Sequence, residues 1–467
     1  MKYDTIVDGA GFAGLICAGY LSKGGHKTLL LEKAPVLGGR SASHGANGYN
    51  PVMHLPLVMT TMNGGGGYGW ANAAKEFGAN IKLHHSREPR LYIKGADNPE
   101  LIIPRCLTTE AAVDWMIKFL ETARPELIHD GLKDVLMPMV SEILDKPFKE
   151  MCTEWDEVSV KDWVLKRSSD SSVQYLFSAL MAGFCWTADA DFTWEMGSAA
   201  KGFVMFRLWL GSQGVMAVAV PDLQHGICEP IADAITHKYG CEIKTNAEVT
   251  KIIIEDGLVR GVKVGDDVFL SDNVVIATTN LDNFKIFEVM PPTLATNLQR
   301  AMKPNMGSVF MMYFLNDSVN FDGAFTLCYD PKSGSVLQGG CMQNVEQPWN
   351  VPKGKQFLWA YSTRTEDDFK LLGLDGIAAE MEENLELLYP GFGRALENKS
   401  QPKGACYPSH YRFTSLPKVK TKSPDIQGLY FAGEYVAPNY GLITDGTAST
   451  GALAAKMILN LDEMAGM

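Results

Sequence analysis

A glycine-rich turn near the N-terminus constrains the fold of this chain more than any other feature. An apolar strand at residues 5–7 is followed by a G-x-G-x-x-G turn made by Gly9, Gly11 and Gly14. A helix of small residues follows at 11–22, and a second apolar strand at 28–31. In such a βαβ unit the first glycine permits a tight turn and the second lets a pyrophosphate approach the backbone. The third lets helix and strand pack closely. The pattern therefore predicts a dinucleotide-binding site in an α/β domain.

Several groups around this turn are candidates for holding the dinucleotide. The first N–H groups of the helix, at Phe12 and Ala13, point the positive end of the helix dipole at a bound pyrophosphate. Glu32 ends the second strand and is expected to accept hydrogen bonds from ribose hydroxyls, with Lys33 beside it. Asp8 departs from the pattern, because the end of this strand is normally apolar.

A second glycine pair, Gly38 and Gly39, is followed by Arg40, which an NAD site does not need at this point. Here the sequence resembles the amine oxidase/phytoene desaturase superfamily of FAD flavoproteins, whose members carry GGR after the first βαβ unit. The resemblance implies FAD as the cofactor, with Gly39 beside it and Arg40 at its phosphates. An exposed arginine that follows a loop is the alternative.

The C-terminal part of the chain extends the resemblance. Residues 428–455 read GLYFAGEYVAPNYGLITDGTASTGALAA, which predicts a strand at 429–432 and a helix over 446–461. Family members end with FAG, an acid and a small-residue helix under the flavin. By that match Gly433 ends the strand at the cofactor and Glu434 binds a ribityl hydroxyl.

Two further matches complete the expected cofactor site. The start of the C-terminal helix would point at the flavin pyrimidine, where the helix dipole stabilises negative charge; it comprises Asp445, Gly446 and Thr447. Residues 244–254 read KTNAEVTKIII, and with GLVRGVKV they resemble a hairpin of the same family. There the backbone of Val249 would touch adenine.

The composition sets further limits. A hydrophobic fraction of 46% over 467 residues suffices for two packed cores. With the resemblance, this predicts an α/β protein: a Rossmann-like FAD domain of the glutathione-reductase type and a mixed α+β substrate domain. The formal net charge of -12 argues against nucleic acid as a partner. The 9 cysteines show neither a disulfide framework nor metal-ligand spacing, so no metal site and a cytoplasmic location are expected.

The matches to FAD proteins divide the chain. The discontinuous FAD domain is expected at residues 1–90, 222–285 and 400–467, and the substrate domain at 91–221 and 286–399. Within the substrate domain, periodicity predicts helices over 109–120 and 160–184 and strands at 306–315 and 357–363. The apolar run 202–220 is interrupted by polar residues and does not read as a membrane span. Peripheral membrane contact stays open.

One local match concerns the attachment of the flavin. Residues 404–407 read GACY and resemble the Gly-Cys-Tyr of monoamine oxidases, whose cysteine is bonded to the flavin 8α carbon. By that match Cys406 would hold FAD covalently and Tyr407 would line the substrate site. A buried free cysteine is the alternative. Tyr440 is a candidate for a second aromatic wall, and Tyr440 or Tyr407 is the candidate acceptor of the substrate proton.

A second local match fails. Residues 307–314 read GSVFMMYF and resemble the amine-oxidase strand whose lysine bridges through water to flavin N5. This chain has Met311 at that place, and no lysine lies between Asn305 and Asn316. A positive charge near N5 would stabilise the negative charge that develops as dioxygen reacts. Its loss weakens the amine oxidase interpretation, and Met311 is expected to extend an apolar wall.

The expected substrate region is rich in Phe, Trp and Met, which line sites for apolar ligands but also fill ordinary cores. Arg207 lies in this region and is expected either to bind a carboxylate or carbonyl oxygen or to snorkel to the surface. His54 falls where family members often have a histidine near the flavin.

These observations predict an FAD-dependent oxidoreductase of the dehydrogenase or desaturase type. It would transfer hydride to flavin N5 from a C–H of an apolar alicyclic or isoprenoid substrate, and pass electrons to a quinone or another acceptor. A redox-neutral double-bond isomerase fits the same residues. The alternatives are a peroxide-producing amine oxidase and a non-catalytic flavoprotein.

Overall fold

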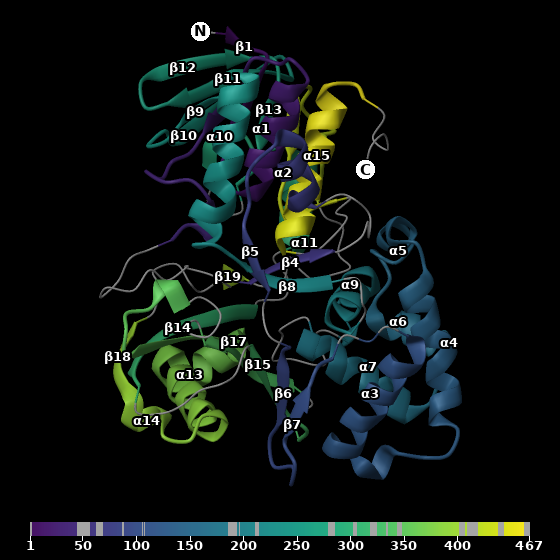
Figure 1. Ribbon diagram of the computed structural model, residues 1–467. Coiled ribbons are helices and arrows are strands. Elements are labelled where there is room, and N and C mark those ends of the chain that lie inside the picture. Colours follow the sequence, from purple (N-terminus) through teal and green to yellow (C-terminus); the bar gives the residue numbers. More distant parts are fainter. Residues whose placement is uncertain are drawn as a thin grey trace.

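The computed structural model places most of the chain in two layered units joined by a small sheet (Figure 1). The residues it describes are 2–43, 57–61, 69–85, 88–104, 106, 108–184, 194–195, 197–210, 214–278, 285–301, 306–317, 325–332, 335–342, 348–400, 407–408, 419–437 and 443–461.

The upper unit is built on a parallel sheet whose strands come from distant parts of the chain. Its order is β21-β13-β2-β3-β9, that is Leu429–Phe431, Val274–Ile276, Thr5–Asp8, Thr28–Leu31 and Glu242–Lys244. One face carries the helices α1, α15, α10 and α2, which span Phe12–Lys23, Ile443–Ile458, Glu229–Tyr239 and Trp70–Phe77. The predicted βαβ unit and the predicted C-terminal strand and helix are thus confirmed as neighbours in space.

The other face of this sheet is covered by an antiparallel meander with one parallel edge strand. Its order is β1-β12-β11-β10, that is Lys2–Tyr3, Asp267–Ser271, Leu258–Val264 and Val249–Glu255. The predicted hairpin is the pair β10 and β11. Apolar side chains alternate along the parallel strands, because successive side chains point to opposite faces. Ile6 packs against the meander and Val7 against the helices.

The lower unit is built on a larger sheet, the mixed sheet, whose strands are mostly antiparallel. Its order is β18-β14-β17-β16-β15-β6-β7, with β19 added beside β14. These strands span Leu396–Ser400, Met306–Asn316, Lys355–Thr365, Ser335–Met342, Thr326–Asp330, Arg90–Ile93, Glu100–Ile102 and Tyr407–Pro408. The helix α13, Glu366–Leu388, covers one face together with the short helix α14, Phe392–Ala395.

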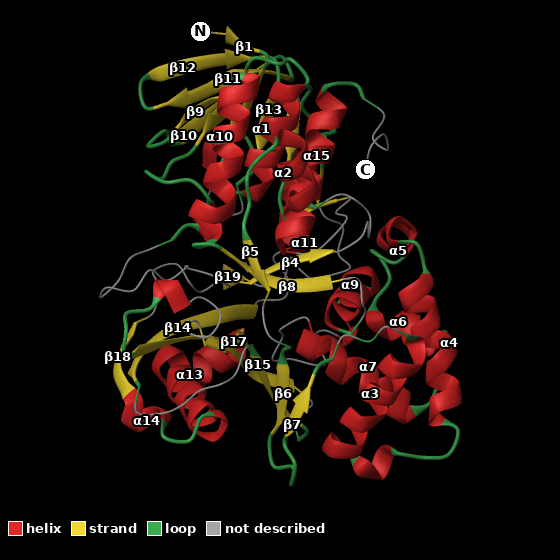
Figure 2. Ribbon diagram, in the orientation of Figure 1, coloured by secondary structure: helices red, strands yellow, loops and turns green. Residues whose placement is uncertain are grey.

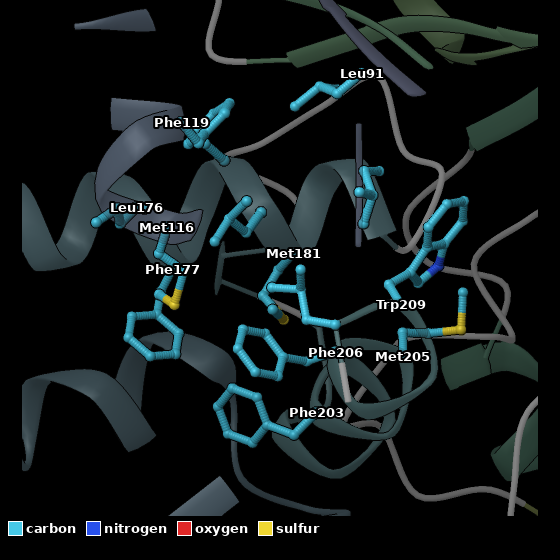
Figure 3. Close-up of a cluster of buried hydrophobic side chains, with 14 of the residues drawn as sticks. Leu91, Met116, Phe119, Leu176, Phe177, Met181, Phe203, Met205, Phe206 and Trp209 are labelled. Atoms are coloured by element: carbon cyan, nitrogen blue, oxygen red, sulfur yellow. The ribbon is translucent and has the colours of Figure 1, made fainter. Parts of the chain in front are cut away.

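A group of helices covers the other face of this sheet, at the lower right of Figure 2. They are α3, α4, α5, α6, α7 and α9, which span Thr109–Ala123, Leu132–Asp145, Phe148–Glu154, Val160–Leu165, Ser171–Phe184 and Ala199–Trp209. Figure 3 shows part of their core, where Phe206 and Phe203 lie near Met181, Phe177 lies beside Met116, and Leu91 of β6 lies at the edge of the cluster.

A three-stranded sheet lies between the two units, with the order β4-β8-β5 and the strands Leu57–Thr61, Gly214–Ala219 and Leu83–His85. Outside these layers lie the strand pair β20 and β22, Val419–Lys420 and Val436–Ala437, the helix α11, Pro292–Ala301, and several short helical turns. Over the described part of the chain, no helix is long and apolar enough to cross a membrane.

One predicted element is wrong in extent. The helix predicted over 160–184 is two helices, α6 and α7, with a turn between them. The turn ends at Asp170, whose carboxylate accepts the N–H of Ser172 at 2.8 Å and so caps the start of α7. The predicted strands at 306–315 and 357–363 are confirmed by β14 and β17.

Candidate cofactor and substrate site

The glycine turn between β2 and α1 has the geometry of a phosphate cradle. Gly9 has a φ of +103°, which favours glycine, and a Cβ on Gly14 would lie 1.8 Å from the Gly9 carbonyl oxygen. A Cβ on Gly11, in contrast, would meet only the Gly38 carbonyl oxygen, at 4.0 Å. Protein atoms therefore leave no room for a side chain at Gly14, whereas the space in front of Gly11 is open for a ligand to approach.

The N-terminus of α1 faces this open space. Its N-cap is Gly11, which provides no side-chain hydrogen bond, and its first turn has no acidic residue. Phe12 and Ala13, the first two helical residues, are buried. An α-helix leaves its first N–H groups without intrahelical partners, so this end of α1 suits an anionic group.

Glu32 lies at the end of β3 and is buried beside the turn. One carboxylate oxygen accepts the N–H of Ala10 at 2.8 Å, and the other accepts that of Ala34 at 2.9 Å. These two bonds hold the carboxylate at the carboxyl edge of the parallel sheet. Lys33 is exposed. Val249, the first residue of β10, is buried in the apolar layer between the meander and the sheet.

Arg40 and Glu434 bring the two ends of the chain together. Arg40 Nη2 donates to Glu434 Oε2 at 2.8 Å, and both side chains are partly buried. The turn that carries Arg40 is anchored to the cradle because the Gly38 N–H donates to the Ala10 carbonyl at 2.9 Å. Gly433, before Glu434, has a φ of +142° and donates its N–H to Thr450 Oγ1 at 2.8 Å.

The start of α15 lies against α2. Asp445 Oδ1 accepts the N–H of Trp70 at 3.2 Å, and a Cβ on Gly69 would lie 2.2 Å from the same oxygen. Thr447 is buried in this first turn, and the Gly446 carbonyl accepts from Ser449 Oγ at 2.7 Å. Sequence analysis missed Trp70, and no local signal points to it.

Trp70 also links α2 to the cradle. Its ring meets Phe12 edge-on, with centroids 6.0 Å apart. A second missed residue is Gln224, on the π-helical turn Gln224–Cys228 that precedes α10. Its side-chain oxygen accepts the N–H of Ser43 at 2.9 Å, just after the Arg40 turn. Helical irregularities of this kind often occur at functional sites.

Buried polar atoms around the cradle support a polar ligand. Four of them find no hydrogen-bond partner among the described residues: Ser43 Oγ, Trp70 Nε1, Thr278 Oγ1 and Thr444 Oγ1. Buried polar groups in folded proteins are nearly always hydrogen-bonded, because leaving one unpaired costs about 1–3 kcal/mol. Together with the open space at Gly11, they fit a large phosphate-containing cofactor.

The strand β14 carries the next candidate residues. Its side chains alternate between the α13 face and the face toward the helical group. Met311 packs on the α13 side, near Met381, and its role in a substrate wall stays a prediction. Phe310 and Met312 face the helical group instead. Successive residues of a strand point to opposite faces, so an alignment that is wrong by one residue assigns a side chain to the wrong face. The match to the amine-oxidase strand does not fix the alignment to a single residue.

Aromatic rings line this other face of the mixed sheet. The Phe310 and Trp359 centroids are 5.3 Å apart, Phe325 stacks on Tyr361 at 6.3 Å, and Trp209 reaches Phe325 at 5.6 Å. All five side chains are buried. The region between the sheet and α9 is therefore apolar and rich in π surface.

Arg207 does not line this region and does not snorkel. Its side chain is only 3% exposed, and it donates from Nε to the Ile143 carbonyl at 2.5 Å and from Nη2 to the Lys146 carbonyl. Both carbonyls belong to the C-terminus of α4, where a cation is favourable. Burial lowers the pKa of the Arg207 guanidinium to about 10, so the side chain stays charged at neutral pH.

The remaining candidate site residues lie at the edge of the described part of the chain or outside it. The backbone of Tyr407 pairs with Ser308 at the start of β14, which brings β19 to the mixed sheet. Tyr440, Cys406 and His54 lie outside the described residues. Within the described part of the chain, no group of three or more acidic, His or Cys side chains could hold a metal.

Comparison with known proteins places this geometry in a family. Residues 7–75 match the NAD(P)-binding Rossmann-like domain, and residues 139–459 match the flavin containing amine oxidoreductases. The chain therefore belongs to the flavin containing amine oxidoreductase family, with FAD as its cofactor. It is an oxidoreductase of the amine oxidase/phytoene desaturase superfamily.

Two plant proteins named 15-cis-phytoene desaturase (chloroplastic/chromoplastic) are among its relatives. The protein of Capsicum annuum is 24% identical over 293 residues, which cover 61% of this chain and 47% of that protein. The chain thus matches about half the length of this relative. The protein of Glycine max is 22% identical over 491 residues, covering 99% of this chain and 80% of that protein.

Solved structures share the fold. An oxidoreductase from Methanosarcina mazei has a TM-score of 0.67 at 18% identity, over 97% of this chain and 99% of that one. The cyclohexylamine oxidase from Brevibacterium oxydans has a TM-score of 0.60 at 15% identity, over 98% and 99%. At such identities the likeness establishes the architecture alone, and function has to be argued from the site.

The Arg40–Glu434 pair gives a first test of the cofactor site. Arg40→Ala is expected to raise the dissociation constant of FAD about tenfold, because a charge-assisted contact to a phosphate is worth about 1.5 kcal/mol. Titration of the apoprotein with FAD, followed by flavin fluorescence, measures this. Arg90→Ala is the matched control, since Arg90 pairs with Glu100 on the mixed sheet. An unchanged affinity in Arg40→Ala would show that Arg40 serves only to position Glu434.

Proposed function

We propose that this protein is an FAD-dependent dehydrogenase or desaturase acting on an apolar alicyclic or isoprenoid substrate. Bound FAD supplies the acceptor for a hydride taken from a substrate C–H. The observation that carries the proposal is the aromatic face of the mixed sheet, formed by Phe310, Trp359 and Tyr361. A surface of this kind would recognise an apolar ligand through dispersion and π contacts rather than through hydrogen bonds.

The charge of β14 supports the same conclusion. From Met306 to Asn316 the strand contains no cationic side chain, and the face toward the helical group presents Phe310, Met312 and Phe314. A cation in this strand would favour reaction of the reduced cofactor with dioxygen, by stabilising negative charge that develops on oxygen. Without it, transfer of electrons to a quinone or another organic acceptor is favoured over peroxide formation.

The chain's own contribution is to orient the substrate, exclude water and accept a proton. Buried aromatic walls exclude water, which strengthens electrostatic interactions inside the site. Tyr407 is proposed to relay the substrate proton, its phenol oxygen accepting that proton as the phenol O–H passes its own to water, because its backbone joins β14 beside Ser308. Tyr440 is the second candidate for this role. If the hydride returned to another carbon of the same substrate, the product would be a double-bond isomer.

An amine oxidase is the second candidate function. The family's description and the fold shared with cyclohexylamine oxidase favour it. A protonated amine is most readily held by carboxylates or aromatic cages. The aromatic face described above offers rings for such a cage, so the two functions have to be separated by the chemistry of the reaction.

Anaerobic flavin bleaching separates them. The purified holoprotein is mixed with an isoprenoid polyene, an alicyclic ketone and primary amines, and the absorbance of oxidised flavin is followed. We expect an isoprenoid or alicyclic compound to bleach the flavin, with reoxidation by a soluble quinone faster than by air. Bleaching by an amine with rapid peroxide release in air would overturn the proposal, as would the absence of bleaching by every compound.

The same sample tests the attachment of the flavin. Acid precipitation releases non-covalent FAD to the supernatant and leaves covalently bound flavin in the pellet. Yellow pellets from the wild type, and colourless pellets from Cys406→Ser, would support the thioether at Cys406. Colourless pellets from both would identify Cys406 as an ordinary free cysteine.

A further inference from the structure

Asp8 is a carboxylic acid built into the cofactor cradle. It is the last residue of β2, pairs with Leu31 of β3 and Ile276 of β13, and directly precedes Gly9. Its side chain alternates with Val7, so it lies on the meander side of the sheet, the side of Ile6 and Leu31. Only 8% of Asp8 is exposed.

The charges that face Asp8 come from two neighbouring elements. Glu32 and Lys33 follow β3, and Glu248 precedes β10. From β13 the neighbours are Ile276 and Ala277, which carry no charge. The Ala247 N–H donates to the Glu32 carbonyl at 2.9 Å, which holds the segment before β10 against the end of β3.

These surroundings favour a neutral Asp8. Both Glu32 oxygens already accept backbone N–H groups. Burial raises the pKa of Asp8 to about 7, and the negative charges of Glu32 and Glu248 act in the same direction against the cation of Lys33. No hydrogen bond or ion pair to the Asp8 side chain is found among the described residues. An apolar residue would therefore serve the sheet better.

We propose that Asp8 is a further residue of the FAD site, and that FAD binds to the form in which this carboxyl carries a proton. FAD brings a negative pyrophosphate to the N-terminus of α1, beside Gly11. An ionised Asp8 would add repulsion at this edge of the sheet, whereas a neutral carboxyl offers an O–H donor to the adenosine half. Binding then takes up one proton from solvent when the apoprotein starts with Asp8 ionised. This inference rests on the cofactor alone and not on the proposed substrate.

The expected result is a dissociation constant for FAD that rises with pH. With half of Asp8 protonated near pH 7, about one molecule in ten is competent at pH 8, so the dissociation constant rises about tenfold between pH 6 and pH 8. Asp8→Asn keeps the shape and a neutral donor, and is expected to bind FAD with nearly the same affinity at both pH values. Flavin fluorescence titration of the apoprotein measures this.

Two controls keep the test decisive. Asp4→Asn removes the carboxylate that accepts the Lys27 N–H at the opposite end of β2, and is expected to keep the wild-type pH dependence. Calorimetry in two buffers of different ionisation enthalpy counts the proton taken up at pH 8. An affinity independent of pH in the wild type, or an unchanged pH slope in Asp8→Asn, would overturn the proposal. A wild-type apoprotein that binds no FAD at any pH would instead contradict the assignment of FAD as the cofactor.

Stability of the apoprotein gives a readout without FAD. The pKa of Asp8 is raised on folding, so the folded state binds more protons than the unfolded state and stability is lost as pH rises from about 4 towards 7. Relative to the wild type, Asp8→Asn is therefore expected to gain in thermal midpoint over this window and to hold that gain above it. A difference between the two proteins that does not vary with pH would contradict a neutral Asp8 in the folded protein.

Discussion

Gly11→Val is expected to lower the affinity for FAD about 100-fold while leaving the protein folded, a loss of about 3 kcal/mol. Gly11 has a φ of -80° and a ψ of -173°, an extended backbone that a β-branched residue adopts readily. The nearest atom to an added Cβ would be the Gly38 carbonyl oxygen, at 4.0 Å. The valine therefore fits the protein and occupies the space through which a pyrophosphate approaches. Fluorescence titration and thermal unfolding of the apoprotein measure the two expectations.

Gly14→Ala is the matched contrast, because the same turn has a second kind of glycine. An added Cβ would lie 1.8 Å from the Gly9 carbonyl oxygen, so α1 has to move away from β2. The expected result is destabilisation of the parallel-sheet unit, seen as a lower thermal midpoint without FAD. A Gly11→Val protein with wild-type affinity, or one as unstable as Gly14→Ala, would show that the cofactor does not pass Gly11.

The parts of the fold that sequence analysis predicted are those with strong local patterns. The order of glycines at Gly9, Gly11 and Gly14 requires a strand before it and a helix after it, and β2 and α1 confirm both. The C-terminal strand and helix were predicted in the same way. Their placement against α1 needed the family resemblance, because nothing local to β21 or α15 specifies a partner at the other end of the chain.

What could not be predicted depends on contacts between distant residues or on the face of a strand. Trp70 is hydrogen-bonded to Asp445, and Gln224 to Ser43, although the two residues of each pair are far apart in the sequence. Neither contact leaves a periodic signal in the sequence. Met311 lies on an alternating strand of apolar residues, where both faces look alike until the neighbouring layers are known.

Arg207 is expected to be a stability residue, and Arg207→Met tests this. The substitution keeps the length of the side chain but removes both donors to the Ile143 and Lys146 carbonyls. Hydrogen bonds from a charged donor contribute about 1.5–3 kcal/mol, and the freed carbonyls stay buried at the C-terminus of α4, so a loss of about 3 kcal/mol is expected. Thermal unfolding and hydrogen exchange of the last turn of α4 measure it.

Two comparisons make this result specific. Lys133→Ala removes a half-exposed cation from the same helix, where it pairs with Glu110 and Asp114, and is expected to leave the thermal midpoint unchanged. FAD affinity is expected to stay at the wild-type value in Arg207→Met, because α4 and α9 belong to the helical group and the cradle lies on the parallel sheet. The opposite result would be an Arg207→Met protein that is as stable as the wild type but whose flavin is not bleached by a substrate of the wild type. That result would show that Arg207 acts in the substrate site.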